Sequence, residues 1–313
     1  MKRINWGIIG LGNIANHHLK SFKKSENCQL KGIASRNSQK LENFKKKINI
    51  HDSFCFNNYE DLIKNSEIDI IYIALPNSYH YEWINKCIDY GKHILVEKPI
   101  TEKSFQLEKI KNKLLQKKSN ILIYEGFMYK YHPQIKKVLE LVKNNEIGDI
   151  KEIVSNFGVN LLTKNFFWLF KKKKKIEKEN RLFNKKLGGG SILDLGCYPV
   201  SFITMLLENL NFINYEDYKI LKKKVEIGKT GVDIDAKIEM RVNTSHNLTH
   251  TILRVVEFYV HGSQILCGEC DTDTTSISLY IDDCEPRYLC VVEYVSDRFL
   301  SWCSERDYYV RRQ

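Results

Sequence analysis

The sequence predicts an α/β domain with a parallel sheet, followed by an α+β domain built on an open, mainly antiparallel sheet. In the first third of the chain, short apolar segments alternate with amphipathic segments of helical spacing, the order that builds a parallel sheet. After about Ile123 this order stops, and later segments alternate polar and apolar residues, as antiparallel strands covered on one face do. The length of 313 residues exceeds one typical domain. We therefore expect domains at residues 1–123 and 124–313.

The elements expected in the first domain alternate between strands and helices. Apolar strands are predicted at residues 4–10, 29–35, 68–75, 93–99 and from 120 onwards. Helices are predicted at residues 13–22, 38–48, 59–65, 80–91 and 104–118. Ser38 is expected to be the N-cap of its helix, and Gly91 to close the helix that precedes it.

The second domain is expected to be less regular. Helices are predicted at 132–148 and at 191–210, the latter behind the glycine run GGG. Strands are predicted at 151–160, 232–242 and 252–260. A parallel sheet followed by an antiparallel one indicates two domains with separate roles.

The composition indicates a soluble globular protein. Apolar residues make up 43% of the chain and aromatic residues 12%, which is enough for a sizeable core. The apolar runs are far shorter than the roughly 20 residues that a membrane helix needs. The N-terminal residues MKRINWGIIG enter a strand without a hydrophobic signal segment. We expect a cytoplasmic protein without a membrane partner.

The net charge of +11 invites a nucleic-acid interpretation, but the distribution of the charge does not favour one. Much of the excess lies on lysine-rich helical faces and in the run KKKKKIEK at 171–178, typical of solvated surface or a variable loop. Aromatic residues do not interleave with it as in a nucleic-acid patch. We expect no nucleic-acid partner, although an anionic cofactor would also benefit from a positive field.

The nine cysteines indicate reduced thiols, because their number is odd and they are scattered. The pair Cys267 and Cys270 in CGEC has the two-residue gap of a zinc or redox site. Its possible partners Cys284 and Cys290 are five residues apart instead of two, so we expect no metal.

The composition changes abruptly near the end of the sequence. All 39 lysines lie at or before Lys237, whereas 7 of the 10 arginines lie after it. The last 76 residues also hold five of the nine cysteines. Either the domain end is divergent, or the segment after about Val242 results from a frame error or a joined foreign segment, since composition varies less abruptly within a domain.

The motif GLGNIA at residues 10–15 follows the first strand and opens a helix. Gly10 permits a tight turn, Gly12 leaves room for a pyrophosphate at the helix N-terminus, and Ala15 keeps helix and strand close. In this context the motif predicts a dinucleotide-binding Rossmann domain, with Gly10, Gly12, Asn13 and Ile14 at the cofactor.

The end of the second strand is expected to face the adenosine ribose. An NAD site usually offers a carboxylate here, whereas this sequence has Ser35, Arg36 and Asn37. Arg36 can bind a 2′-phosphate in bidentate fashion, and Ser35 can donate a hydroxyl. NADP is therefore favoured over NAD, with the alternative that Arg36 stacks on the adenine.

Ligands of open α/β sheets bind beyond the carboxyl ends of the strands. The segments at these ends are ALPNSYH, VEKP and YEGFMYKYHP. Lys98 lies at the end of the strand predicted at 93–99, in this region, so we expect it to point at the cofactor crevice.

The order of five motifs resembles the Gfo/Idh/MocA oxidoreductases. These motifs are GLGNIA, ALPNSYH, VEKPIT, YEGFMYKYHPQ and GGGSILDLGCYPVS, and the resemblance runs from about residue 4 to residue 205. Within the family, the sequence is most similar to glucose-fructose oxidoreductase and the dimeric dihydrodiol and D-xylose dehydrogenases.

The resemblance implies an NAD(P)-dependent oxidoreductase acting on a sugar or a vicinal diol. It places Lys98 beside the nicotinamide and substrate, and Tyr198 and Asp194 of DLGCY at the proton transfer. A lysine ammonium nearby favours the tyrosine phenolate, which can then accept the substrate hydroxyl proton. The further cofactor residues are Leu75, Pro76, Asn77, His80 and Glu97.

Two alternatives stay open at this point. Inositol dehydrogenases of the same family carry histidine at the position of Tyr198, so an inositol-type polyol dehydrogenase is one. The other is a cofactor-binding regulator without catalysis, against which Lys98 and Tyr198 argue. The resemblance also implies a homodimer or homotetramer, assembled through the outer face of the second-domain sheet.

Overall fold

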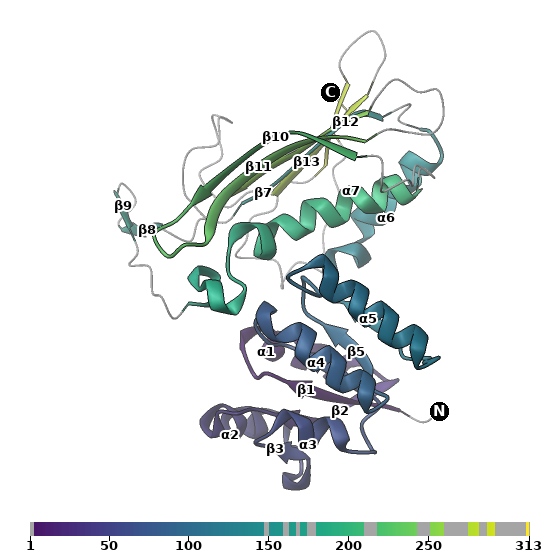
Figure 1. Ribbon diagram of the computed structural model, residues 1–313, viewed down its shortest axis with the longest axis vertical. Helices are drawn as coiled ribbons and strands as arrows, with labels where there is room; N and C mark the ends of the chain where they lie inside the picture. Colours follow the sequence, from purple (N-terminus) through teal and green to yellow (C-terminus); the bar gives the residue numbers. More distant parts are fainter. Residues whose placement is uncertain are drawn as a thin grey trace. The chain divides into compact units, whose positions relative to one another are not determined.

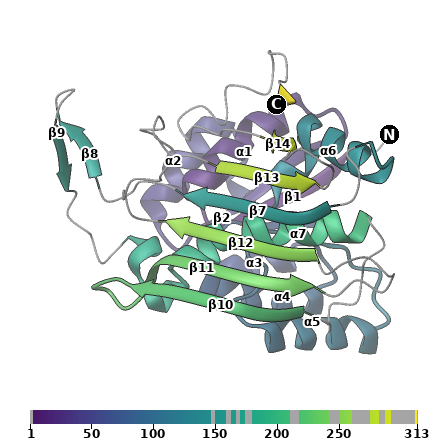
Figure 2. The ribbon, with the colours of Figure 1, turned by 90° about the horizontal axis from the view of Figure 1, so that it is seen from above.

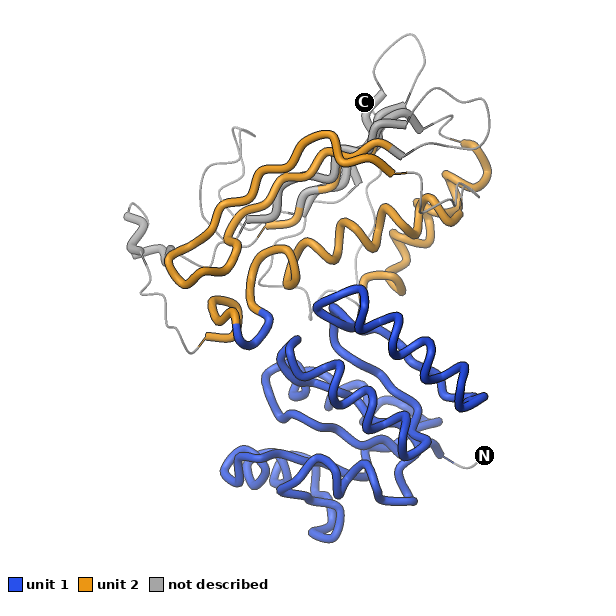
Figure 3. The backbone as a smooth tube through the Cα atoms, in the orientation of Figure 1, with its two compact units in different colours: residues 1–127, 186–188 blue, residues 128–185, 189–313 orange. Residues whose placement is uncertain are grey.

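The computed structural model describes residues 3–146, 150–158, 163–166, 170–173, 180–209, 218–242, 251–259, 275–281, 287–291 and 311–312. The chain divides into two compact units, shown in two colours in Figure 3. Unit 1 comprises Met1–Phe127 and Lys186–Gly188, and unit 2 comprises Met128–Lys185 and Gly189–Gln313.

Unit 1 contains a six-stranded parallel sheet with the strand order β3-β2-β1-β4-β5-β6 (Figure 1). The strands are β1 (Ile4–Ile9), β2 (Cys28–Ala34), β3 (Cys55–Phe56), β4 (Ile70–Ile73), β5 (His93–Val96) and β6 (Ile123–Glu125). The helices are α1 (Asn13–Lys24), α2 (Ser38–Ile48), α3 (Tyr59–Lys64), α4 (Asn77–Asp89) and α5 (Ser104–Gln116), with a 3₁₀ turn η1 (Asp52–Phe54). The order reverses between β1 and β4, which is the doubly wound topology and confirms the predicted Rossmann fold.

Helices cover both faces of this sheet, because successive strand residues point to opposite sides. On one side Ile8 and Ile33 pack with Leu19 and Phe44 of α1 and α2. The core on the other side is formed by residues of β1, β4, α3, α4 and α5, namely Ile9, Ile71, Ile73, Leu62, Ile84, Cys87 and Ile110. The continuous apolar strands of the sequence are thus buried on both faces.

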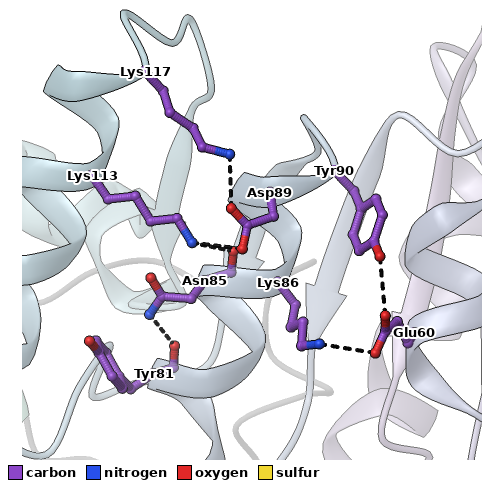
Figure 4. A network of polar contacts seen from close by, with 8 residues as sticks. All are labelled: Glu60, Tyr81, Asn85, Lys86, Asp89, Tyr90, Lys113 and Lys117. Carbon is purple, nitrogen blue, oxygen red and sulfur yellow. Dashed lines mark hydrogen bonds and ion pairs between the residues drawn. The ribbon is translucent and has the colours of Figure 1, made fainter.

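Polar contacts join the outer ends of α3, α4 and α5 (Figure 4). Glu60 of α3 accepts hydrogen bonds from Lys86 Nζ and from the Tyr90 hydroxyl, each at 3.1 Å. Asp89 accepts from Lys113 of α5 and from Lys117, the C-cap residue of α5, each at 2.8 Å. These contacts tie the three helices together at the surface.

Two helix starts differ from the sequence-based expectation. The N-cap of α2 is Asn37 and not Ser38, because the Asn37 side chain accepts a hydrogen bond from Lys40 N at 2.9 Å. Helix α4 begins at Asn77, three residues before the predicted start, since Pro76 at its N-cap already has a suitable φ of −60°. The end of α4 is as predicted, with Gly91 at a φ of +69° after the C-cap.

Unit 2 contains a seven-stranded sheet with the order β10-β11-β12-β7-β13-β14-β15, seen from above in Figure 2. Its described strands are β7 (Ile150–Gly158), β10 (Tyr218–Ile227), β11 (Asp233–Val242), β12 (Thr251–Tyr259), β13 (Thr275–Ile281), β14 (Arg287–Val291) and β15 (Arg311–Arg312). The β12–β7 pair is parallel and the other pairs are antiparallel, so the sheet is mainly antiparallel, as predicted. A separate hairpin pairs β8 (Thr163–Phe166) with β9 (Phe170–Lys173).

Helices α6 (Pro133–Lys143) and α7 (Cys197–Asn209) pack on one face of this sheet. Val138 of α6, Phe202 and Leu206 of α7, and Ile153 and Ala236 of the sheet share one core cluster. Short 3₁₀ turns lie at η2 (Met128–Tyr131), η3 (Arg181–Phe183) and η4 (Lys185–Leu187), and a π-helix, η5 (Ile192–Gly196), leads into α7. The single helix predicted at 191–210 is thus partly π-helical.

The helical stretch 185–209 is long and apolar enough to cross a membrane by length and composition. Half of its apolar window is buried inside the structure, and α7 contributes Phe202, Ile203, Leu206 and Leu207 to the core. A buried core helix accounts for this composition.

Candidate functional site

The glycine turn after β1 has the geometry that a dinucleotide loop requires. Gly10 has a φ of +89°, and a Cβ there would lie 2.5 Å from the Ala74 carbonyl oxygen. Gly12 is the N-cap of α1 and would place a Cβ in open space, with nothing within 4 Å. The first turn of α1, including Asn13 and Ile14, holds no acidic residue. Its free N–H groups therefore suit an anion, and the residues present fit a pyrophosphate.

The residues after β2 differ in their availability. The Ser35 side chain is buried, and its hydroxyl oxygen accepts from Asn37 N at 3.1 Å. Asn37 is engaged as the N-cap of α2. Arg36 is exposed, with its guanidinium over the rings of Tyr59 and Tyr79. Interactions with the two phenols, first Tyr79 and then Tyr59, raise the pKa of Arg36 above its usual value.

Lys98 lies in a short loop directly after Glu97, at the carboxyl end of β5, and is half-buried. The loop is held from two neighbouring strands. Glu97 N donates to Ile73 O of β4 at 3.1 Å, and Ile100 N donates to the Glu125 carboxylate of β6 at 2.7 Å. The backbone around Lys98 is thus fixed on both sides of the lysine.

His80 is fully buried and bridges the ends of two strands. Its Nδ1 lies 2.8 Å from Pro99 O, in the Lys98 loop, and its Nε2 lies 2.9 Å from Leu75 O, after β4. Both partners are backbone carbonyl oxygens, so the ring joins the two segments through its two nitrogens. His80 contributes to the site by positioning backbone, because its ring has no exposed surface.

The side chain of Glu97 points back into unit 1. It accepts a hydrogen bond from the hydroxyl of Tyr72, a residue of β4 with 1% exposure. Burial first, and then the Glu97 carboxylate, raise the pKa of the Tyr72 phenol. The ring of His18 meets Tyr72 edge-on at 4.8 Å, and burial lowers the pKa of that histidine. Through this hydrogen bond to Tyr72, Glu97 fixes the Lys98 loop to the core of unit 1.

The glycine run Gly188–Gly190 is closed to larger residues at each position. A Cβ on Gly188 would lie 2.2 Å from the Glu102 carboxylate. The Gly188 carbonyl oxygen accepts a hydrogen bond from Asn77 Nδ2 at 2.8 Å, and all three residues belong to unit 1. A Cβ on Gly189 would lie 2.5 Å from the carbonyl oxygen of Arg181. A Cβ on Gly190 would lie 2.2 Å from the carboxylate of Asp233, a residue of β11.

In unit 2 this packing sets the start of the segment that carries Asp194 and Tyr198. Asp233 accepts from Ser191 Oγ at 2.8 Å and from Ile192 N at 2.6 Å. Arg181 contacts Asp194 Oδ1 through both terminal nitrogens, at 3.2 and 3.3 Å. The side chain of Asp194 is 14% exposed and that of Arg181 48%. π-Helical turns such as η5 often mark functional sites.

Tyr198 lies in the first turn of α7 and is half-buried. Its ring is 5.0 Å from the Phe157 ring and 5.9 Å from the Tyr129 ring. Tyr129 is itself held by a hydrogen bond from its hydroxyl to Ser201 Oγ at 2.9 Å. His132 serves as the N-cap of α6, with Nδ1 accepting from Gln134 N at 3.3 Å.

The structure thus groups the site residues within each unit. The cofactor candidates and Lys98 belong to unit 1, and Asp194 and Tyr198 belong to unit 2. Among the described residues, no group of three His, Cys, Asp or Glu is arranged to hold a metal ion. Cys267, Cys270 and Cys284 lie outside the described residues, as does most of the run at 171–178.

Sequence reasoning missed several supporting residues: Tyr59, Tyr72, Tyr79, Arg181 and Asp233. Arg181 is 13 positions from its partner Asp194, and Asp233 is 42 positions from its partner Ser191. Only the fold brings these residues next to the glycine run and DLGCY. The three consecutive glycines were the one available signal, since such a run indicates close approach of backbone from elsewhere.

The fold and the glycine turn define the class of protein: a dinucleotide-binding protein of the Rossmann type. Residues 4–126 match the family model described as "Oxidoreductase family, NAD-binding Rossmann fold", and residues 135–263 match the "GFO/IDH/MocA C-terminal domain". The chain belongs to the Gfo/Idh/MocA oxidoreductase family. The match to the second model extends past the compositional break near Val242.

Curated relatives include enzymes that act on diols and sugars. The chain is 31% identical over 230 residues to trans-1,2-dihydrobenzene-1,2-diol dehydrogenase of Xenopus tropicalis, covering 73% of this chain and 62% of the relative. It is 27% identical over 217 residues to D-xylose 1-dehydrogenase (NADP(+)) of Hypocrea jecorina, covering 66% and 54%. The matched part of the chain spans less than two thirds of the length of these relatives.

Solved structures share the fold at low identity. A 3-ketoreductase from Actinomadura kijaniata, in complex with NADP and TDP-benzene, has a TM-score of 0.66 at 20% identity, covering 94% of this chain and 86% of that chain. Scyllo-inositol dehydrogenase from Lactobacillus casei has a TM-score of 0.67 at 20% identity, covering 93% and 75%.

Proposed function

We propose that the protein is an NADP-preferring oxidoreductase acting on a sugar or vicinal-diol substrate. The observation that carries this proposal is the Lys98 loop, a cation fixed at the carboxyl end of a parallel strand near the open glycine turn. In doubly wound sheets this edge, at the reversal between β1 and β4, is where nucleotides bind. A bound nicotinamide supplies the hydride acceptor or donor.

The proposed cofactor residues would act at different parts of the dinucleotide. Gly10, Gly12, Asn13 and Ile14 would form the pyrophosphate turn, and Ser35 and Arg36 the ribose end. His80 and Glu97 would act by fixing backbone, since their side chains are engaged inside unit 1. The remaining residues, which would line the nicotinamide end, are Leu75, Pro76, Asn77 and Lys98.

Proton transfer is assigned to Lys98, Tyr198 and Asp194. Tyrosine is ordinarily protonated at neutral pH, and a lysine ammonium within a few ångströms favours its phenolate. Tyr198 would then accept the substrate hydroxyl proton, Lys98 would orient the substrate oxygen, and Asp194 would bind a neighbouring hydroxyl. This assignment places 1–123 as the cofactor domain and 124–313 as the substrate and assembly domain.

The relatives support the substrate class. One relative is named for a 1,2-diol and another for D-xylose, and both of these molecules carry hydroxyl groups on adjacent carbons. This chain has Tyr198 at the position where inositol dehydrogenases of the same family carry histidine, which favours a sugar or diol over an inositol substrate. The xylose dehydrogenase name also supports NADP over NAD.

The test is nicotinamide absorbance with purified protein, NADP and a panel of aldoses and trans-dihydrodiols. Turnover is expected, with loss of at least about a hundredfold in Lys98→Ala and Tyr198→Phe, as for loss of an acid–base group. Cofactor affinity of Tyr198→Phe should stay unchanged. Tight NADP binding without turnover on any substrate would favour a regulator, and turnover restricted to inositols would favour the polyol dehydrogenase.

We further propose a cytoplasmic homodimer or homotetramer assembled through the sheet face opposite α6 and α7. On this face β10 and β11 present charges of both signs. In the register Lys222 lies opposite Glu239, two lysines lie opposite each other at 224 and 237, and two carboxylates at 226 and 235. An interface built on such charges weakens with salt. Sedimentation at about 0.05 M and 0.5 M salt should show dissociation at the higher value, and a salt-independent monomer would contradict the proposal.

A further inference from the structure

The exposed Arg36 side chain lies between two aromatic rings. Its guanidinium carbon is 5.3 Å from the centroid of the Tyr79 ring and 5.5 Å from that of the Tyr59 ring. Both distances fall within the range of cation–π contacts. Tyr79 is half-buried, and Tyr59 is 6% exposed. An exposed arginine is therefore held by two side chains that are themselves more buried.

The three residues come from separate segments of unit 1. Arg36 follows β2, Tyr59 is the first residue of α3, and Tyr79 lies in the first turn of α4. The Tyr59 ring meets Trp83 edge-on, with centroids 5.1 Å apart and planes at 85°. The core of unit 1 thus sets the position of one ring, and the start of α4 sets the other.

The two phenols also stabilise the arginine electrostatically. Interactions with the two phenols, first Tyr79 and then Tyr59, raise the pKa of Arg36, whereas burial lowers it. Tyr59 and Tyr79 therefore contact the guanidinium with their ring faces and favour its charged form.

Building on the proposed function, we propose that Tyr79 and Tyr59 are specificity-determining residues that select NADP over NAD by holding Arg36 toward the 2′-phosphate. The neighbouring side chains leave this task to Arg36, because Asn37 caps α2 and the Ser35 hydroxyl accepts from Asn37 N. Arginine carries considerable rotamer freedom, and a guanidinium fixed beforehand loses less of it on binding. A planar guanidinium also matches phosphate in bidentate fashion.

The competing role, stacking of Arg36 on the adenine, makes a different prediction. Adenine is common to NADP and NAD, so loss of stacking would weaken both equally. Only contact with the 2′-phosphate changes the ratio of the two dissociation constants.

The experiment is a fluorescence titration of the full-length protein with NADPH and NADH, repeated by calorimetry with 2′,5′-ADP and 5′-AMP. In Tyr79→Leu, the preference for the 2′-phosphate ligand should fall about two- to fivefold, which corresponds to one exposed cation–π contact. Tyr79→Phe keeps the ring and its volume but removes the hydroxyl, so its preference should fall by a smaller factor. This milder variant keeps the test decisive if Tyr79→Leu folds poorly.

Two controls separate this role from general effects. Tyr90→Leu removes a similar contact in the same unit, since the Tyr90 ring lies 5.6 Å from Lys64 Nζ, and should leave the preference unchanged. Arg36→Ala should reduce the preference strongly, and adding Tyr79→Leu to it should change nothing more.

Three results would overturn the proposal: an equal loss of affinity for both ligands, a preference unchanged in both Tyr79 variants, or a Tyr79→Leu effect that persists without Arg36. The first points to adenine stacking. If the wild-type protein bound neither dinucleotide, the proposed function itself would fail. If it bound NADPH but the Tyr79 variants gave one of these three results, only the role of the tyrosines would fail.

Discussion

Asp194 and Arg181 form an ion pair in which both terminal guanidinium nitrogens meet the same carboxylate oxygen, at 3.2 and 3.3 Å. Arg181 reaches this position because the turn η3 packs directly on Gly189, whose missing side chain leaves room for the Arg181 carbonyl. The pair thus links a glycine required by sterics to the orientation of a proposed catalytic carboxylate.

Replacing Arg181 should impair turnover more than cofactor binding. Arg181→Ala leaves Asp194 without this guanidinium, and a misplacement near 1 Å can cost up to about a hundredfold in rate. We expect kcat to fall by about tenfold or more while NADPH affinity is unchanged, with partial rescue in Arg181→Lys. Steady-state kinetics and a titration of NADPH measure the two effects. Equal loss of NADPH binding would show a structural role instead.

Gly190→Ala should destabilise unit 2. Gly190 has a φ of +126° and a Cβ there would lie 2.2 Å from the Asp233 carboxylate, which would displace the bonds to Ser191 and Ile192. Gly231→Ala is the matched control, because Gly231 has a φ of +81° with nothing within 4 Å. Strained backbone alone costs about 1–2 kcal/mol. Thermal melts should show a clearly larger loss for Gly190→Ala, and equal losses would refute the steric argument.

The glycine turn allows fold and cofactor binding to be separated. In Gly12→Ala the new methyl group faces open space at the helix N-terminus, so the melting temperature should not change. NADPH affinity should fall by about tenfold or more, because the methyl group occupies the approach of the pyrophosphate. Gly10→Ala should instead lower the melting temperature, since its methyl group meets Ala74 O at 2.5 Å. Unchanged affinity in Gly12→Ala would contradict the proposed site.

Glu60 should contribute to the acid sensitivity of unit 1. Hydrogen bonds from Lys64, Lys86 and Tyr90 lower its pKa from 4.5 to about 2. A carboxyl group whose pKa is lowered on folding stabilises the protein above its unfolded pKa, and this stability is lost as the pH falls through the folded pKa. Glu60→Gln should therefore melt lower than the wild type at pH 7, and the difference should vanish between about pH 4.5 and 2. Glu82→Gln, at an exposed glutamate of α4, should show no such convergence.

The sequence predicted the order of elements in unit 1, apart from η1 and the two-residue strand β3, because the other strands are continuous apolar runs separated by turn signals. It also placed GLGNIA and the Lys98 loop correctly at strand ends, since both follow from local pattern. Strand β10 escaped prediction because most of its side chains, Tyr218 and Ile227 among them, are exposed on the edge of the sheet. Without a buried face, a strand shows no regular alternation.

The contacts that position the site residues could not be predicted from local sequence pattern. The Arg36 contacts with Tyr59 and Tyr79 join the segment after β2 to the first turns of α3 and α4, which lie close together only in the folded sheet. His80 reads as a candidate ligand residue in the sequence, but its two carbonyl partners show that it fixes backbone. Such roles depend on burial and on partners distant in sequence.

Cys87 lies in the core of unit 1 with no exposed surface, whereas Cys28 and Cys55 are partly exposed. Burial raises the pKa of the Cys87 thiol, against an opposing effect of Lys92. Because only an accessible thiolate attacks an alkylating reagent, Cys87 reacts when α4 opens away from the core. The rate at which excess iodoacetamide labels the Cys87 peptide therefore measures how often the nucleotide-binding unit opens, and Cys87 is a built-in probe of this motion.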